Sequence, residues 1–347
     1  MIGTASVVRV VLITIVLMSL TLLLWAGRDV LFILFFGVLV GIVLSVFADR
    51  LAGWGVPRLA AVLLVLLAIL GLLTAFAVLL WPTVREQLGI VGRELPRAVE
   101  DVVRWIQAQY GAVIEPGEPV PDLEEEVQSS LPIRPGAIIS GAIPIINTAV
   151  GALTGALVGL AVGVYTAINP GLYRRGLERL TPPVHRERAG LALDRANHSL
   201  RRWMVGTLIN MVVVGVMTGT GLMLIGVPAP IALGVIAGLL EFIPIVGPIL
   251  ASVPGIALAL TVSPVTALWV TIFYIVVQQI EGNVLMPVIM RGAVRLPPAL
   301  TVLFQTLMAV TFGFLGLLLA VPLLAVAVVM AKTLYVEPME SGTPDEA

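Results

Sequence analysis

Two acidic residues stand almost alone in the second half of this chain. Between Trp203 and Val336 the sequence holds five charged residues, which are Glu241, Glu281, Arg291, Arg295 and Lys332. The surrounding segments are apolar, and a carboxylate at membrane depth costs several kcal/mol unless it is paired, protonated or hydrated. Carboxylates placed in this way can bind a cation, carry a proton or hydrogen-bond a polar solute.

The first acid opens the stretch EFIPIVGPIL at 241–250, in which residues that break regular backbone follow it closely. A functional interpretation makes Glu241 part of a substrate, proton or cation site. A structural interpretation makes it a cap for backbone N–H groups that the break leaves free. The sequence leaves both open, and the candidate residues of this stretch are Glu241, Phe242, Pro244, Gly247 and Pro248.

The second acid lies in QQIEGNVLMP at 278–287, where polar residues crowd the end of an apolar helix. Amides beside a carboxylate suit a small polyhydroxylated solute or a hard cation, although a helix end at the membrane surface can be polar without such a role. The candidates are Gln278, Gln279, Glu281, Asn283 and Pro287. We expect Arg291 and Arg295 to fix topology, with a salt bridge to either acid as the alternative.

The composition requires a membrane protein to position these residues. The chain has 347 residues, of which 59% are hydrophobic and 12% charged, and its mean hydropathy is +1.07. A soluble protein of this length needs far more polar surface. We therefore predict an all-α polytopic membrane protein with about six spanning helices, two re-entrant helical hairpins and external amphipathic helices.

The first half divides by hydropathy into four parts. Residues 1–82 predict three transmembrane helices, 83–135 an external amphipathic and acidic segment, 136–169 a long glycine-rich transmembrane helix, and 170–202 a basic cytoplasmic segment. The long helix carries a glycine every four residues, a stripe that permits close helix packing within or between protomers. These glycines are Gly151, Gly155, Gly159 and Gly163.

Length distinguishes two segments within the transport region, 203–336, from ordinary spans. A span needs about 20 helical residues, so 229–260 is too long for one span, yet each arm beside its Pro/Gly break is too short to cross. Segment 297–332 has the same property, with a break at 313–316. We predict two re-entrant hairpins, the second marked by Gly313, Phe314, Gly316 and Pro322, and a disordered C-terminal tail at 337–347.

Several functional classes are poorly supported. The chain has no cysteine, no GxxxxGK[ST] motif and no histidine in a predicted span, so we expect no metal, no cofactor and no enzyme activity. With the N-terminus inside, fourteen basic residues fall on the cytoplasmic side and six outside. The positive-inside rule therefore predicts cytoplasmic termini in the inner membrane, and makes 170–202 a topology signal and not a nucleic-acid site.

The motifs EFIPIVGP, QQIEGNVLMPVIM, LPPALTVL and GFLGLLLAVPLLAV closely resemble the autoinducer-2 exporter family of PerM-like permeases. The resemblance implies an oligomeric secondary transporter, a pentamer, whose hairpins form a transport domain that moves elevator-fashion. It places Glu241, Pro244, Gly247 and Pro248 at the first hairpin tip, Gly313 and Gly316 at the second, and Glu281 and Asn283 beside the pathway. Family members are linked to export of this quorum-sensing signal and some to Na⁺(Li⁺)/H⁺ antiport.

Three functions remain open at this point. The first is export of a small polar solute such as autoinducer-2, with coupling to H⁺ or Na⁺. The second is Na⁺(Li⁺)/H⁺ antiport by the two isolated acids. The third is a non-transport membrane scaffold or assembly factor whose external segment, 83–135, binds a partner.

Overall fold

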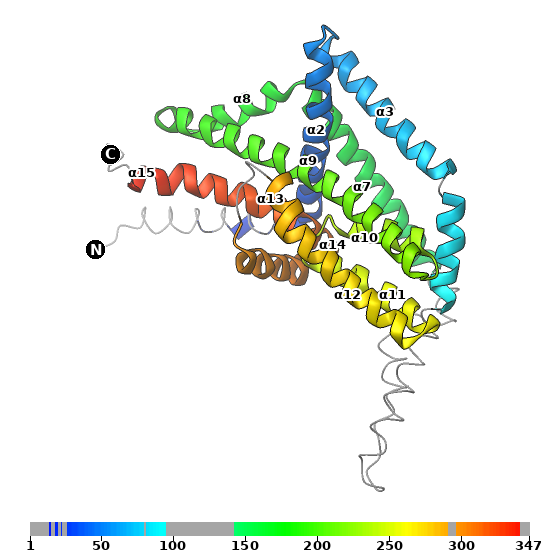
Figure 1. Cartoon of the computed structure of the whole chain (residues 1–347). Helices are drawn as coiled ribbons and strands as arrows, with labels where there is room; N and C mark the ends of the chain where they lie inside the picture. The colour runs from blue at the N-terminus through cyan, green and yellow to red at the C-terminus, as the bar shows by residue number, and fades with distance from the viewer. Residues whose placement is uncertain are drawn as a thin grey trace.

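The computed structural model describes residues 26–79, 81–94, 142–290 and 296–340, together with Thr14, Met18, Ser19 and Leu22. Helices joined by short turns make up this part of the chain, and it holds no strand, which confirms the all-α prediction (Figure 1). Most of the first predicted span and most of 83–135 lie outside the described residues.

The helices follow one another in a fixed order along the chain. They are α2 (Arg28–Gly53), α3 (Arg58–Leu79), a helix over 81–94, α7 (Ala142–Ile168), α8 (Pro170–Leu180), the short η1 (Pro183–His185), α9 (Arg186–Ile225), α10 (Pro230–Leu240), α11 (Val246–Val262), α12 (Pro264–Ile280), the π-helical η2 (Glu281–Leu285), α13 (Met286–Ile289), α14 (Pro298–Ala331), the π-helical η3 (Lys332–Val336) and α15 (Glu337–Glu340).

Within the described residues, five helices are long and apolar enough to cross a membrane. The number rises to six when α7 and α8, which meet at a bend of 90°, count as one broken span. By contrast, α10 and α11 are shorter apolar helices. These lengths confirm about six spans, and one of the helices counted, over Pro298–Glu340, is broken at Gly313. The chain is a multi-pass membrane protein.

The glycine stripe of α7 packs against α2. A Cβ added at Gly159 would lie 3.1 Å from the Phe36 ring, and one at Gly163 would lie 2.9 Å from the carbonyl oxygen of Gly37. On the facing helix, a Cβ at Gly41 would lie 2.8 Å from the Gly163 carbonyl oxygen. These glycines therefore let the backbones of α2 and α7 contact each other closely within the protomer.

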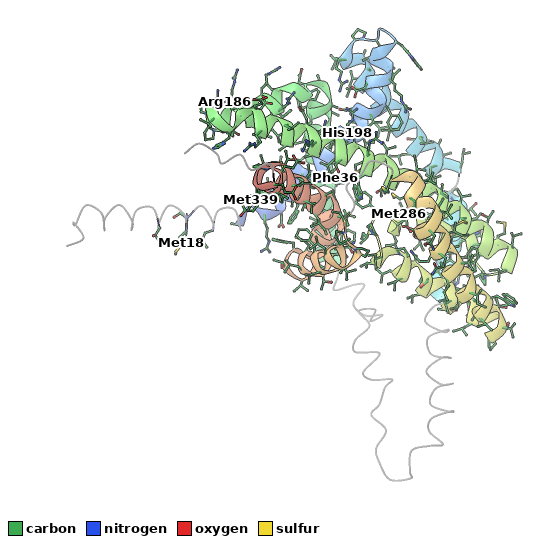
Figure 2. All side chains as sticks on the ribbon, turned by 60° about the vertical axis from the view of Figure 1, so that its left-hand side comes forward. Met18, Phe36, Arg186, His198, Met286 and Met339 are labelled. Atoms are coloured by element: carbon green, nitrogen blue, oxygen red, sulfur yellow. The ribbon has the colours of Figure 1, made fainter. Side chains whose placement is uncertain are left out.

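A single helix, α9, replaces two predicted elements. The sequence divided the chain at 202, between the basic cytoplasmic segment and the transport region, but the structure has 40 continuous helical residues across this boundary. Backbone hydrogen bonds within a helix do not depend on side-chain polarity, so the change from basic to apolar residues does not end it. Figure 2 shows Arg186 at the outer end of α9, with His198 further along towards the helices packed around it.

The end of the described chain also differs from its prediction. The segment from 337 was expected to be disordered, yet α15 continues η3 over four residues. Arg195 of α9 donates to both carboxylate oxygens of Glu337, at 2.8 and 2.6 Å, and to the Thr333 hydroxyl at 3.2 Å. This ion pair attaches the first tail residues to α9, while 341–347 lie outside the described residues.

The helix over 81–94 packs onto the second half of the chain. Its Val84 and Val91 are buried in one apolar cluster with Leu222, Leu233 and Leu258 of α9, α10 and α11. The described part of the predicted amphipathic segment therefore lies against the protein.

Candidate functional site

The first predicted hairpin is formed by α10 and α11, which are joined by the turn 241–245 (Figure 1). Ile245 has φ 71° and ψ −55°, and the N–H of Val246 donates to the Pro244 carbonyl at 2.9 Å. This is a γ-turn with positive φ, a strained conformation for a β-branched residue. Two residues on, a Cβ at Gly247 would collide with the Leu240 carbonyl oxygen, so the turn closes only over glycine.

A second element holds this tip from outside. Gln305 of α14 is 1% exposed and donates its amide N–H to the Pro244 carbonyl at 3.0 Å. Its carbonyl oxygen, Oε1, is buried without a hydrogen-bond partner. The turn of the first hairpin and the first arm of the second are therefore in direct contact.

The two isolated acids meet on one asparagine. Asn210 of α9 donates through Nδ2 to Oε1 of Glu241 and to Oε1 of Glu281, each at 3.1 Å. Exposure is 2% for Asn210, 2% for Glu241 and 4% for Glu281, so water is excluded from all three. Two buried carboxyl groups around one amide form the polar centre of an otherwise apolar region.

The two carboxyl groups differ in how they are satisfied. Glu281 accepts a second hydrogen bond at Oε2, from Gln278 at 3.0 Å, and it opens the π-helical turn η2. The Oε2 atom of Glu241 is buried and has no hydrogen-bond partner. Single π-helical turns of this kind are frequent at functional sites because they reorient one side chain.

The Glu241 carboxylate accepts a hydrogen bond from Asn210. The Pro244 carbonyl at the tip accepts instead from the N–H of Val246 and from Gln305. The neighbouring Phe242 packs edge-on against Trp203 of α9, with ring centroids 5.6 Å apart. Pro248 lies in the first turn of α11.

Some predicted site residues lie away from this centre. Asn283 donates to Gln279 at 2.9 Å in an exposed pair, and Pro287 is also exposed. Of the four polar residues in QQIEGNVLMP, only Glu281 is buried in this centre, and the exposed Gln278 donates to it.

The second predicted hairpin lies within α14. Its backbone leaves the helical region at Gly313, where φ is 65° and ψ is −148°. Phe314 is exposed, while a Cβ at Gly316 would collide with the Met308 carbonyl, so the chain turns back closely there. Pro322 is buried inside the second arm.

The described residues contain no group of three His, Asp or Glu side chains that could hold a metal ion. Within the same residues, neither Glu241 nor Glu281 has a lysine or arginine at ion-pair distance. Arg291 and Arg295, the predicted alternative salt-bridge partners of these acids, lie outside the described residues.

Comparison with known proteins places this chain in a family. A family model described as AI-2E family transporter matches residues 12–335. The chain belongs to this family.

Individual relatives agree with that membership. YrrI of Bacillus subtilis, named as a transport protein, is 33% identical over 46% of this chain and 45% of its own length. YueF of the same organism, also named as a transport protein, is 25% identical over 84% of this chain and 82% of its own. The Escherichia coli permease PerM is 26% identical over 88% and 89%. An AI-2E family protein with these relatives is a membrane transporter.

In this AI-2E family chain, sequence reasoning missed two residues of the site. Asn210 and Gln305 are each a lone amide within a long apolar run. Polar residues inside spans usually face the protein interior, and that signal could have selected both. Their partners on other helices depend on the fold and could not have been read from spacing.

Proposed function

We propose that this transporter exports a small polar solute, such as the signal autoinducer-2, by elevator-like movement of its two hairpins. The observation that carries the proposal is the buried centre of Asn210, Glu241 and Glu281 beside the tip of a broken helix pair. Irregular backbone at membrane depth is tolerated where protein buries it or where it lines a cavity. Hydrogen-bonding groups at such a break are suited to a polar solute.

The contact between the hairpins supports their movement as one unit. Gln305 of α14 holds the Pro244 carbonyl of the first tip, so displacement of one hairpin acts directly on the other. Family membership supports an oligomer, a pentamer, in the inner membrane, and the basic segment 170–202 supports cytoplasmic termini.

Reconstitution in liposomes tests the export function. We expect wild-type protein to move autoinducer-2 down an imposed gradient, and Glu241→Gln to lower the rate at least about tenfold, equivalent to about 1.4 kcal/mol of barrier. Gln279→Leu changes an exposed amide outside the centre and serves as the control. A wild-type protein that moves no autoinducer-2 would remove this solute, whereas an unchanged rate in Glu241→Gln would remove the site.

The second candidate is Na⁺(Li⁺)/H⁺ antiport, which the pair of buried acids favours. Exchange of H⁺ for Na⁺ on a carboxylate needs no organic solute. The same preparation, loaded with a pH-sensitive dye, would report a change of internal pH after a pulse of Na⁺ or Li⁺. A dye signal that stays constant through such pulses would exclude this candidate.

A further inference from the structure

We propose that Glu241 Oε2 is the atom that binds an exchangeable proton, and that Glu281 is the permanent anion of the pair. The inference deepens the transport function proposed above and rests on it. It identifies the proton as the coupled ion, and it assigns different roles to two acids that look equivalent in the sequence.

The hydrogen bonds distinguish the two acids. Both oxygens of Glu281 accept a side-chain N–H, from Asn210 at 3.1 Å and from Gln278 at 3.0 Å. Donors at both oxygens favour the ionised form of a carboxyl group. Glu241 accepts one N–H, from Asn210, and its second oxygen is buried with no donor. A proton added to that oxygen would displace no existing hydrogen bond.

Electrostatics favours one proton on the pair. Two carboxylates that contact the same amide repel each other, and burial removes the water that would weaken this repulsion. A single proton removes both the repulsion and one of two buried charges. The proton enters from water on one side of the membrane and returns to water on the other, while Glu281 keeps its charge.

The groups that face Glu241 leave the proton as the simplest ion for the site. Among the described residues, α9 presents Asn210 and η2 presents Glu281, whereas α14 contributes Gln305 at the neighbouring Pro244. Glu281 is the one titratable side chain in this set. The described residues also hold no group of three acidic or histidine side chains that could bind a metal ion.

The proton also affects the hairpin. An ionised Glu241 holds α10 to α9 through a charge-assisted hydrogen bond, and such bonds are about twice as strong as neutral ones. Protonation of Glu241 weakens its bond to Asn210, while the bond between Asn210 and Glu281 stays. Proton binding thus loosens the first tip from α9 and leaves η2 attached.

Infrared difference spectroscopy of the reconstituted full chain tests the assignment. A buried protonated carboxylic acid gives a C=O stretching band that solvent-exposed acids, which are ionised at neutral pH, do not give there. We expect this band at neutral pH in the wild-type protein and its loss in Glu241→Gln. In Glu281→Gln the repulsion between the two acids is absent, so we expect the band of Glu241 to appear only at lower pH than in the wild-type protein. Both variants keep the shape of the side chain, and size-exclusion chromatography checks that each is folded.

Each result decides the inference. A wild-type protein without the band, a band that survives in Glu241→Gln, or a folded Glu281→Gln that shows no band at any pH would overturn it. The spectrum needs no solute flux, so a band without autoinducer-2 transport would remove the export function and leave the proton site.

Discussion

At the scale of single residues, Asn210 joins the two buried carboxyl groups of the site. It gives hydrogen bonds to two carboxyl groups from different elements, and its own carbonyl oxygen, Oδ1, has no hydrogen-bond partner. A buried polar group that loses its partner costs about 1–3 kcal/mol, and more when the group is charged. Stability and function therefore depend on the same amide.

Replacing this amide should destabilise the protein strongly. We expect Asn210→Leu to lower the free energy of unfolding by at least about 2 kcal/mol, because two buried carboxyl groups each lose a donor. Denaturant unfolding of the detergent-purified protein measures the change. Asn283→Leu makes the same replacement at an exposed pair and should stay within about 0.5 kcal/mol. Equal losses in the two variants would contradict the role of Asn210.

At the scale of elements, close contact between helix backbones holds the first hairpin. Gly215 and Gly219 of α9 face Gly234 and Gly238 of α10, and a Cβ at Gly234 would lie 2.7 Å from the Gly215 carbonyl oxygen. Helices in a membrane gain little from the hydrophobic effect, so association depends on such packing. The first hairpin can pack closely on α9 because the facing residues are glycines.

A single added methyl group should disturb the packing of α10 on α9. We expect Gly234→Ala to destabilise the protein by about 1–3 kcal/mol, because α9 and α10 must separate to admit it. Gly176 of α8 has no atom within 4 Å of an added Cβ. There the same substitution should stabilise the helix by about 0.5–1 kcal/mol. Thermal unfolding in detergent compares the two, and a shift of the same sign in both would contradict this packing.

At the scale of the whole molecule, each of the two hairpin tips carries an exposed apolar residue. Ile245 at the first tip is 38% exposed, and Phe314 at the second is 66% exposed. In the proposed orientation the first hairpin begins at the outer side of the membrane and the second at the cytoplasmic side. The tips are then expected to face opposite aqueous compartments.

Cysteine labelling tests this layout directly, because the natural chain has no cysteine. We expect a membrane-impermeant maleimide to label Ile245→Cys only from outside and Phe314→Cys only from inside. Intact cells and inside-out vesicles supply the two sides, and detergent-solubilised protein shows that each cysteine can react. Labelling of both positions from one side would refute opposite-facing hairpins.

The lengths of two apolar segments were sufficient to predict the hairpins from the sequence. The chain between 229 and 260 cannot cross as one helix, and a break beside Pro244 follows from the residue types. Gly313 likewise falls at the predicted second break. These features are local, so sequence spacing determines them.

Other features depend on the fold. The sequence selected Glu241 and Glu281 but not Asn210, which brings them together from a third element. It also predicted that Gln279 and Asn283 join the site, whereas helix rotation leaves them exposed. A change of polarity near 202 suggested a boundary that α9 does not have. Tertiary contacts and the phase of each helix decide such cases.

The hydrogen bond between the helix over 81–94 and α10 limits how the transporter can divide into fixed and moving bodies. Gln87 accepts the free N–H of Ala232 in the first turn of α10, at 2.9 Å, and Val84 is buried in the same apolar cluster as Leu233. A body that carries α10 must carry this helix too, unless buried apolar contacts break. In the proposed elevator movement, α3 would then connect the moving body to the N-terminal spans.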